Sequence, residues 1–357
     1  MSKSSKIVCA SMVVVFSMSA GAAERPPPQR LPDLPERMEK GFDLYPKRVV
    51  DAMSTKRSRD AAEAARKAAT DAARGEFPSI APEELRWRFV TTVTVAFNGG
   101  NESAYRLIEK AAREWTGHVP HFNLSFRAPD GRFRHWSDKD APERPVADVR
   151  ISFDGSGYWS LVGTQAKSTV PGNEATMNLG DIATVAAAYA SPDREAAWLK
   201  TYAHSVVLHE LGHVFGLAHE HFQASCQNDM KLKFDAGYSQ TFDSKGQFIP
   251  DAAKRSPGIF LWYQGYPYST VDQNQLRKNI TLAGYVASFE DPAELRWISS
   301  GMDGQSVMLY WYPEYLFVSG FESPCKNLGD GKTGQTVYAT HLSRHDVEAF
   351  VGFYGKI

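Results

Sequence analysis

The stretch HELGHVFGLAHEH, residues 209–221, places four histidines, two glutamates and two glycines in thirteen positions. On a helix, residues four apart project from one face about one turn apart, so His209 and His213 are spaced to share an ion. Imidazole nitrogens suit zinc, which at catalytic sites takes three protein ligands and leaves one position for water. The stretch therefore predicts two zinc ligands on a helix and a third ligand supplied from elsewhere.

Gly216 predicts where the third ligand comes from. A helix continued through this position would carry His219 about 240° around the axis from His213. A glycine here can instead adopt the left-handed conformation that ends a helix, so the chain turns back and His219 reaches the ion. Glu210, beside the first ligand, is positioned to take a proton from water and later deliver it to a leaving amine. We expect one catalytic Zn²⁺ ion and no second metal.

The pattern HExxHxxGxxH resembles the metzincin clan of zinc endopeptidases, whose second signature is a methionine turn beneath the metal. SVMLYW, residues 306–311, is similar to that turn. The resemblance implies that Met308 forms the floor of the site, with an ordinary core methionine as the alternative. It also implies that Tyr310 approaches the zinc and donates to an oxyanion, with a packed aromatic as the alternative. Glu220 is astacin-like and SVMLYW is closer to serralysins, so the chain is identified with the clan, with a preference for the astacin-like family.

The resemblance implies an α/β (α+β) zincin domain with a twisted mixed sheet, an active-site helix and a lower C-terminal subdomain that ends in a helix. Residue patterns favour strands in WRFVTTVTVAF (87–97), HFNLSFR (121–127) and ADVRISFD (147–154), and a Gly-rich stretch follows, GSGYWSLVG (155–163). EATMNLG (174–180) is a further candidate strand. If it is the exposed edge of the sheet, an extended substrate can pair with it; the alternative is an edge covered by other residues.

Helices are predicted from apolar residues three and four apart. They cover 101–115, with Asn101 as the cap, and 191–217, within which 193–200 is either part of the helix or a separate turn. Leu208, Leu211 and Phe215 would anchor the second helix in the core. A closing helix follows Ser343, with Val347, Phe350 and Val351 on its apolar face, and ends at Gly355.

The chain divides into three predicted regions. Residues 1–22 read as a secretory signal, with an uncleaved membrane anchor as the alternative. Residues 23–84 form a pre-segment, a Pro-rich arm followed by an Ala-rich helix over 56–74. Residues 85–357 form the catalytic domain. His219 and Met308 are 89 residues apart, more than usual for the clan, which indicates an insertion at about 222–300 built from loops and short elements.

Cysteine usage bears on the compartment and on latency. Signal cleavage would remove Cys9 and leave Cys226 and Cys325, which either form one disulfide in an oxidising compartment or stay as two buried thiols. No cysteine lies between Ala23 and Cys226, so a cysteine switch upstream is excluded. Asp43 is a candidate for a latency residue, and an arm that only assists folding is the alternative.

Composition limits the partners. A net charge of −1, with 43% hydrophobic and 12% aromatic residues, points neither to nucleic acid nor to an anionic membrane. Beyond the signal, no segment looks transmembrane. The remaining histidines, including His204, His221, His341 and His345, are expected to be solvated or structural.

The function expected from these features is a secreted, extracellular or periplasmic, zinc metalloendopeptidase that acts on a protein or peptide substrate. One alternative is a secreted zinc-holding binding module without turnover, against which the intact Glu210 argues. Another is a zinc hydrolase of a non-protein amide such as a cell-wall peptide bridge. Side-chain preference and oligomeric state are not predicted by the sequence.

Overall fold

The computed structural model describes residues 81–82, 85–154, 157–230, 297–298, 301–312, 317, 319, 322–329 and 338–355. All of them belong to one compact unit, Pro35–Ile357. The predicted signal at 1–22, the helix at 56–74, Asp43 and residues 231–296 of the predicted insertion lie outside the described residues. The division of the chain at residues 22 and 84 therefore stays a prediction.

A five-stranded mixed sheet forms the base of the domain. Its strands are β2 (Thr92–Asn98), β3 (Asn123–Ser125), β4 (Val149–Ser152), β5 (Tyr158–Ser160) and β6 (Met177–Leu179). The order is β3-β2-β4-β6-β5, with β5 antiparallel to β6 and all other pairs parallel. A separate antiparallel pair joins β1 (Ala81–Pro82) to β7 (Trp297–Ile298). The mixed sheet with its helices confirms the predicted fold class.

Strand β6 lies inside the sheet, so the condition under which EATMNLG would offer an exposed edge to substrate is not met. β6 pairs with β4 through Ile151 and Met177 and with β5 through Trp159 and Asn178. The end strands of the sheet are β3 and β5, and β5 lies inside the Gly-rich stretch 155–163, where no strand was predicted. Three buried residues make up this strand, too few to show a period between the glycines that flank it.

Strand β2 begins at Thr92, five residues later than the alternation from Trp87 predicts. Phe89 has a φ of +59°, which a strand residue does not adopt. The Trp87 indole donates to the Val214 carbonyl at 2.7 Å, a contact 127 residues away in sequence. This long-range contact, which no local pattern encodes, turns the chain away from the sheet.

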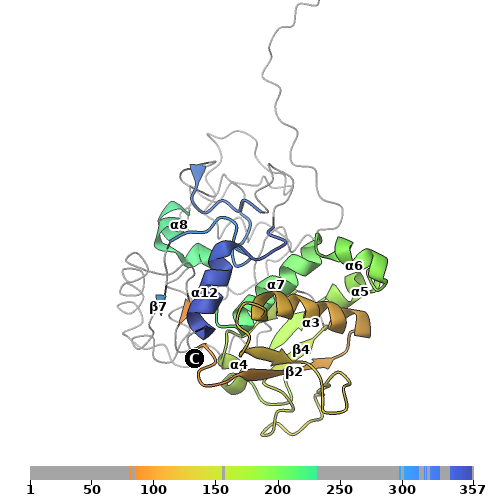
Figure 1. Cartoon of the computed structure of the whole chain (residues 1–357). Helices are drawn as coiled ribbons and strands as arrows, with labels where there is room; N and C mark the ends of the chain where they lie inside the picture. Colours follow the sequence, from red (N-terminus) through yellow and green to blue (C-terminus); the bar gives the residue numbers. More distant parts are fainter. Residues whose placement is uncertain are drawn as a thin grey trace, which may run out of the picture. The chain divides into compact units, whose positions relative to one another are not determined.

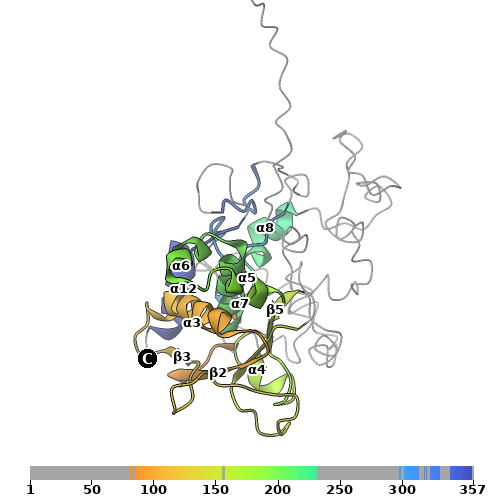
Figure 2. The same ribbon diagram turned by 90° about the vertical axis from the view of Figure 1, so that its right-hand side faces the viewer.

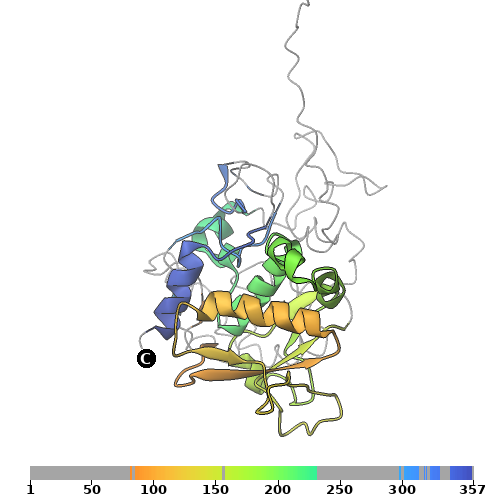
Figure 3. The ribbon, with the colours of Figure 1, turned by 45° about the vertical axis from the view of Figure 1, so that its right-hand side comes forward.

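Helix α3 (Glu102–Thr116) begins where predicted, because the Asn101 side chain accepts from the Ala104 N–H at 3.0 Å. Its predicted apolar positions are all buried: Ala104, Leu107, Ile108, Ala111, Ala112 and Trp115. Figure 3 shows α3 lying along one face of the sheet. α5 (Ile182–Ala187) and α7 (Tyr202–Val214) lie on the same side and contact it (Figures 1 and 2).

The segment predicted as a helix over 191–217 forms two helices, the second of the alternatives for residues 193–200. α6 (Pro192–Trp198) starts with its proline in the first turn, and α7 starts after Thr201, whose hydroxyl accepts from the His204 N–H. A short helix absent from the sequence prediction, α4 (Gln165–Ser168), follows β5. The split leaves α7 as a separate 13-residue helix that carries the zinc motif.

Helix α12 (Arg344–Tyr354) closes the chain as predicted, with Ser343 and Asp346 forming a capping box and Gly355 at its end. Phe350 is buried, but Val351 is 37% exposed, so the predicted apolar face is only partly right. Tyr354 is buried in α12 where Val351 was expected to be, and its ring stacks on Phe122 with centroids 4.1 Å apart.

Residues beyond the third histidine are tied to the segment after SVMLYW. The 3₁₀ turn η3 (Glu220–Phe222) leads into α8 (Ala224–Asp229). Cys226 in α8 forms a disulfide with Cys325, which settles the two alternatives in favour of pairing. Within the described ranges, no helix has both the length and the apolar character needed to cross a membrane.

Candidate metal centre

Helix α7 holds the first two histidines in a rigid setting. Every residue of the helix is buried, and its neighbours include α3, α5 and β5. On the α3 side, the Trp115 indole donates to the Leu208 carbonyl at 3.2 Å. His209 and His213 therefore project from a helix whose position is determined on several sides.

The turn after α7 brings in the third histidine. Gly216 has a φ of +91°, in the left-handed region that the motif spacing predicts. Its N–H donates to the His213 carbonyl at 2.8 Å, and the Leu217 N–H donates to the Gly212 carbonyl at 3.0 Å. These bonds end the helix and reverse the chain, which places His219 opposite His213.

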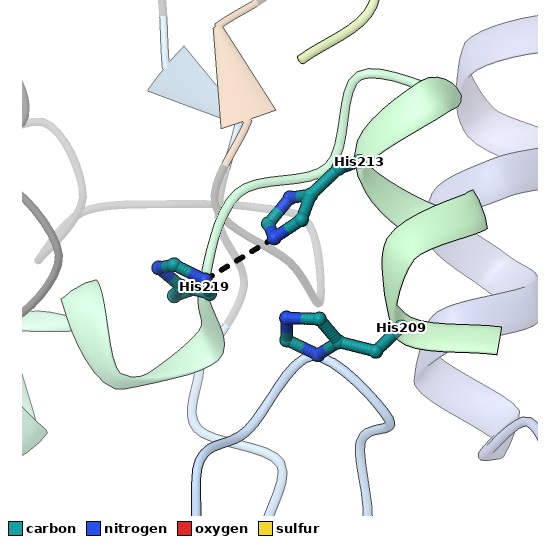
Figure 4. A group of neighbouring side chains, drawn as sticks. All are labelled: His209, His213 and His219. Carbon is teal, nitrogen blue, oxygen red and sulfur yellow. Dashed lines mark hydrogen bonds between the residues drawn. The ribbon is translucent and has the colours of Figure 1, made fainter. Parts of the chain in front are cut away.

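The three imidazole rings converge on one point (Figure 4). The Nε2 atoms of His213 and His219 are 3.1 Å apart, and one nitrogen of each ring lies within 4.8 Å of those of the other two. Two ligands at about 2.0–2.1 Å from a tetrahedral zinc ion lie about 3.3 Å from each other. In the part of the chain that the structure describes, only these three residues form such a group.

Hydrogen bonds determine which nitrogen of each helical histidine faces the centre. His209 Nδ1 lies 2.7 Å from the Val307 carbonyl, and His213 Nδ1 lies 2.7 Å from the Leu217 carbonyl. A carbonyl oxygen only accepts, so each Nδ1 donates, and in the neutral ring Nε2 is then the nitrogen that presents a lone pair. Neutral imidazoles with inward lone pairs are the donor set that zinc takes, so the residues fit the ion.

Glu210 is the neighbour of His209 on α7, and Tyr310 packs against the histidine cluster. Glu210 follows His209 on α7 and is buried. The Tyr310 ring lies 4.3 Å from the His219 ring and 5.5 Å from the His209 ring, measured between centroids. The Tyr310 ring therefore packs against two of the three histidines.

Met308 lies directly against α7 at Gly212, the residue before His213. It is fully buried, and a Cβ added to Gly212 would come within 2.3 Å of its sulfur. The thioether thus occupies the space that a side chain at position 212 would fill. Sequence analysis missed Gly212, although a glycine inside a helix, which costs roughly 0.5–1 kcal/mol relative to alanine, is a signal of close packing.

Asp346 at the start of α12 holds the turn that carries Met308, and it too was missed. Its carboxylate accepts from the Ser306 hydroxyl at 2.6 Å and from the Val307 N–H at 3.0 Å. Val307 in turn provides the carbonyl that orients His209. Burial raises the pKa of Asp346 to about 6. The capping-box pattern around Ser343 was the available signal, but it showed only the local role of this carboxylate.

Glu220, the astacin-like residue, is fully buried below the site. Its Oε1 accepts from the Asp303 N–H at 3.0 Å, and burial raises the pKa of this carboxyl well above its ordinary value. The Glu220 N–H donates to the Met308 carbonyl at 2.9 Å. This residue therefore links the third ligand to the methionine turn through the backbone.

The other histidines differ in their surroundings. His204 is buried and lies 2.8 Å from the Glu114 carboxylate. His345 is half-exposed, 3.8 Å from the Asp303 carboxylate, and His341 is exposed. His221 is buried and stacks on the His219 ring at 4.9 Å, so it contacts the site although it is outside the ligand cluster.

Comparisons with known proteins return a likeness of fold. No protein-family model and no curated protein matches the chain. Among solved structures, the chain is similar to two structures of myroilysin, with 21% identity in both. The first has a TM-score of 0.47 and covers 78% of this chain and 99% of that chain. The second has a TM-score of 0.40 and covers 76% of this chain and 86% of that chain. The chain is also similar to high choriolytic enzyme 1, a hatching enzyme zinc-protease from Oryzias latipes, with a TM-score of 0.33 and 12% identity over 76% of this chain and 96% of that one. The chemistry of the site is therefore argued from its own residues.

Proposed function

We propose that this chain is a secreted zinc-dependent metalloendopeptidase that hydrolyses peptide bonds of a protein or peptide substrate. His209, His213 and His219 would hold one Zn²⁺ ion. The observation that carries the proposal is the convergence of the three imidazole rings. Backbone carbonyls accept hydrogen bonds from Nδ1 of His209 and His213. The resemblance to astacin-like metzincins supports the same reaction class.

Each step of the reaction has a residue suited to it. Zinc, when bound, supplies a Lewis acid that lowers the pKa of water to about 7. Glu210 removes the proton from the attacking water and delivers it to the leaving nitrogen. Tyr310, whose ring lies against His219, donates a hydrogen bond to the oxyanion that forms from the scissile carbonyl. Met308 and Gly216 keep the ligands in place.

Secretion is supported by two features. The first 22 residues have the charged start, apolar run and small-residue end of a secretory signal. The disulfide between Cys226 and Cys325 is of the kind that persists in oxidising compartments. We therefore place the mature protein outside the cytoplasm, in the periplasm or beyond the cell.

Replacing Glu210 with Gln tests the proposal. The variant should retain zinc, because the three ligands are untouched, and kcat on casein or a peptide library should fall by about 10²–10⁴-fold, because the proton acceptor is lost. Glu348→Gln is the matched control, since this carboxylate is on the exposed side of α12 and pairs with Arg344. Zinc content by elemental analysis and cleavage with and without a chelator are the measurements.

The outcomes separate the proposal from its rivals. Cleavage by the wild type that stops on chelation, together with an inactive Glu210→Gln variant, supports the endopeptidase. Zinc binding without cleavage of any peptide favours a binding module. Cleavage confined to cell-wall peptides favours a hydrolase of non-protein amides. Undiminished turnover by Glu210→Gln excludes this residue as the base.

A further inference from the structure

The C-terminal end of α7 receives donors from three distant parts of the chain. The last carbonyls of a helix have no intrahelical N–H partner and need donors from outside. The His213 carbonyl accepts from the Gly163 N–H at 2.8 Å, the Val214 carbonyl from the Trp87 indole at 2.7 Å, and the Phe215 carbonyl from the Tyr354 hydroxyl at 2.8 Å. The turn that leads to His219 is therefore held by tertiary contacts.

Residues Leu85–Trp87, here called the N-terminal strap, lie against two neighbouring glycines, Gly163 and Gly216. The Leu85 carbonyl accepts from the Thr164 N–H at 2.8 Å, and a Cβ at Gly163 would lie 1.8 Å from that carbonyl oxygen. The position of a Cβ at Gly216 is 3.5 Å from the Arg86 Cα. The strap thus lies directly against the glycine whose turn brings in the third ligand.

Trp87 is the anchor of the strap. It is 1% exposed, its own N–H donates to the Tyr354 hydroxyl at 3.4 Å, and the Lys167 ammonium lies 5.0 Å from its ring centre. The Tyr354 hydroxyl in turn donates to the Phe215 carbonyl. Trp87 and Tyr354 therefore form one hydrogen-bonded unit that binds two successive carbonyls of the turn.

We propose that Trp87 is a positioning residue for the metal centre; the inference rests on the proposed zinc site. Its indole N–H holds the Val214 carbonyl and so preserves the turn through Phe215 and Leu217. The Leu217 carbonyl orients His213, and the chain beyond it carries His219. Without the indole donor, a buried carbonyl loses its partner and the turn relaxes, so two of the three ligands lose their alignment.

The test compares Trp87→Phe with Trp136→Phe in the full-length mature protein. Trp136 is a matched control because it is also buried and its indole also donates to a backbone carbonyl, that of Ile151 at 2.9 Å, in the sheet rather than at the metal centre. Zinc affinity is measured by competition with a chromophoric chelator. We expect Trp87→Phe to weaken zinc binding about ten-fold. Saturating zinc should restore kcat, and Trp136→Phe should bind zinc like the wild type.

Tyr354→Phe keeps the proposal testable if Trp87→Phe does not fold. It removes the hydroxyl that binds the Phe215 carbonyl and should also weaken zinc binding. A zinc affinity equal to that of the wild type in Trp87→Phe overturns the proposal. If only Tyr354→Phe folds, the same result in that variant overturns it. An equal loss of zinc affinity in Trp136→Phe also overturns it. If the wild type binds zinc and cleaves peptide while these variants overturn the role of Trp87, the proposed function still stands. A wild type that binds no zinc refutes both.

Discussion

Gly212, which lies between His209 and His213 in the sequence, leaves room for the Met308 side chain against α7. Replacing a glycine inside a helix by alanine ordinarily stabilises a protein by about 1 kcal/mol. Here the added methyl would lie 2.3 Å from the Met308 sulfur and 3.2 Å from its terminal carbon, and overpacking of a core costs about 1–3 kcal/mol. We expect Gly212→Ala to lower the free energy of unfolding by about 1 kcal/mol, measured by urea denaturation.

The double variant Gly212→Ala/Met308→Ala isolates this contact. Met308→Ala alone removes a buried side chain and should cost about 2–5 kcal/mol. With the thioether absent, the new methyl has space, so adding Gly212→Ala to Met308→Ala should cost nothing further. A stabilising effect of Gly212→Ala in the wild-type background would contradict the close packing of Met308 against α7.

Helix α12 and the methionine turn are joined through Asp346, and this contact depends on pH. Burial raises the pKa of Asp346 from 3.8 to about 6 in the folded protein. The folded state therefore binds the proton more tightly, so the contribution of this group to stability is complete below pH 4 and is lost as pH rises through about 6. The difference corresponds to at most about 3 kcal/mol.

Replacing Asp346 with Asn should remove this dependence and keep the fold, because the amide oxygen still accepts from the Val307 and Ser343 N–H groups. Urea unfolding of both proteins between pH 4 and pH 7.5 measures the effect. The stability of the wild type relative to the variant should increase as the pH falls. Glu348→Gln, on the exposed side of the same helix, should leave the pH dependence unchanged. A parallel pH dependence in wild type and Asp346→Asn would contradict the raised pKa.

At the scale of the whole domain, the disulfide closes a loop that contains both the predicted insertion and the methionine turn. Cys226 and Cys325 are 99 residues apart in sequence. Cross-linking a loop of this length restricts the unfolded chain and stabilises a protein by about 3–5 kcal/mol. The variant Cys226→Ala/Cys325→Ala should therefore unfold at a lower temperature. A reducing agent should lower the melting temperature of the wild type and leave that of the variant unchanged.

Local patterns predicted the elements whose contacts are short in sequence. Asn101 caps α3 and Ser343 caps α12 through bonds to residues three positions away, which a sequence pattern contains in full. Strand β5 and the start of β2 were missed because their conformation depends on distant partners. Trp87 lies outside β2 because its indole donates to the Val214 carbonyl of α7. β5 is a strand because it pairs with β6.

Local sequence was enough to specify the cluster of three histidines. The spacing of His209, His213 and His219 around Gly216 specifies a helix, a left-handed stop and a returning loop, all of which are local geometry. The contacts that hold this geometry come from distant parts of the chain: the Val307 carbonyl, Asp346, the Met308 contact with Gly212 and the strap at Trp87. The physical reason is that a buried donor or acceptor takes whichever partner the fold brings within reach, and sequence spacing does not contain that distance.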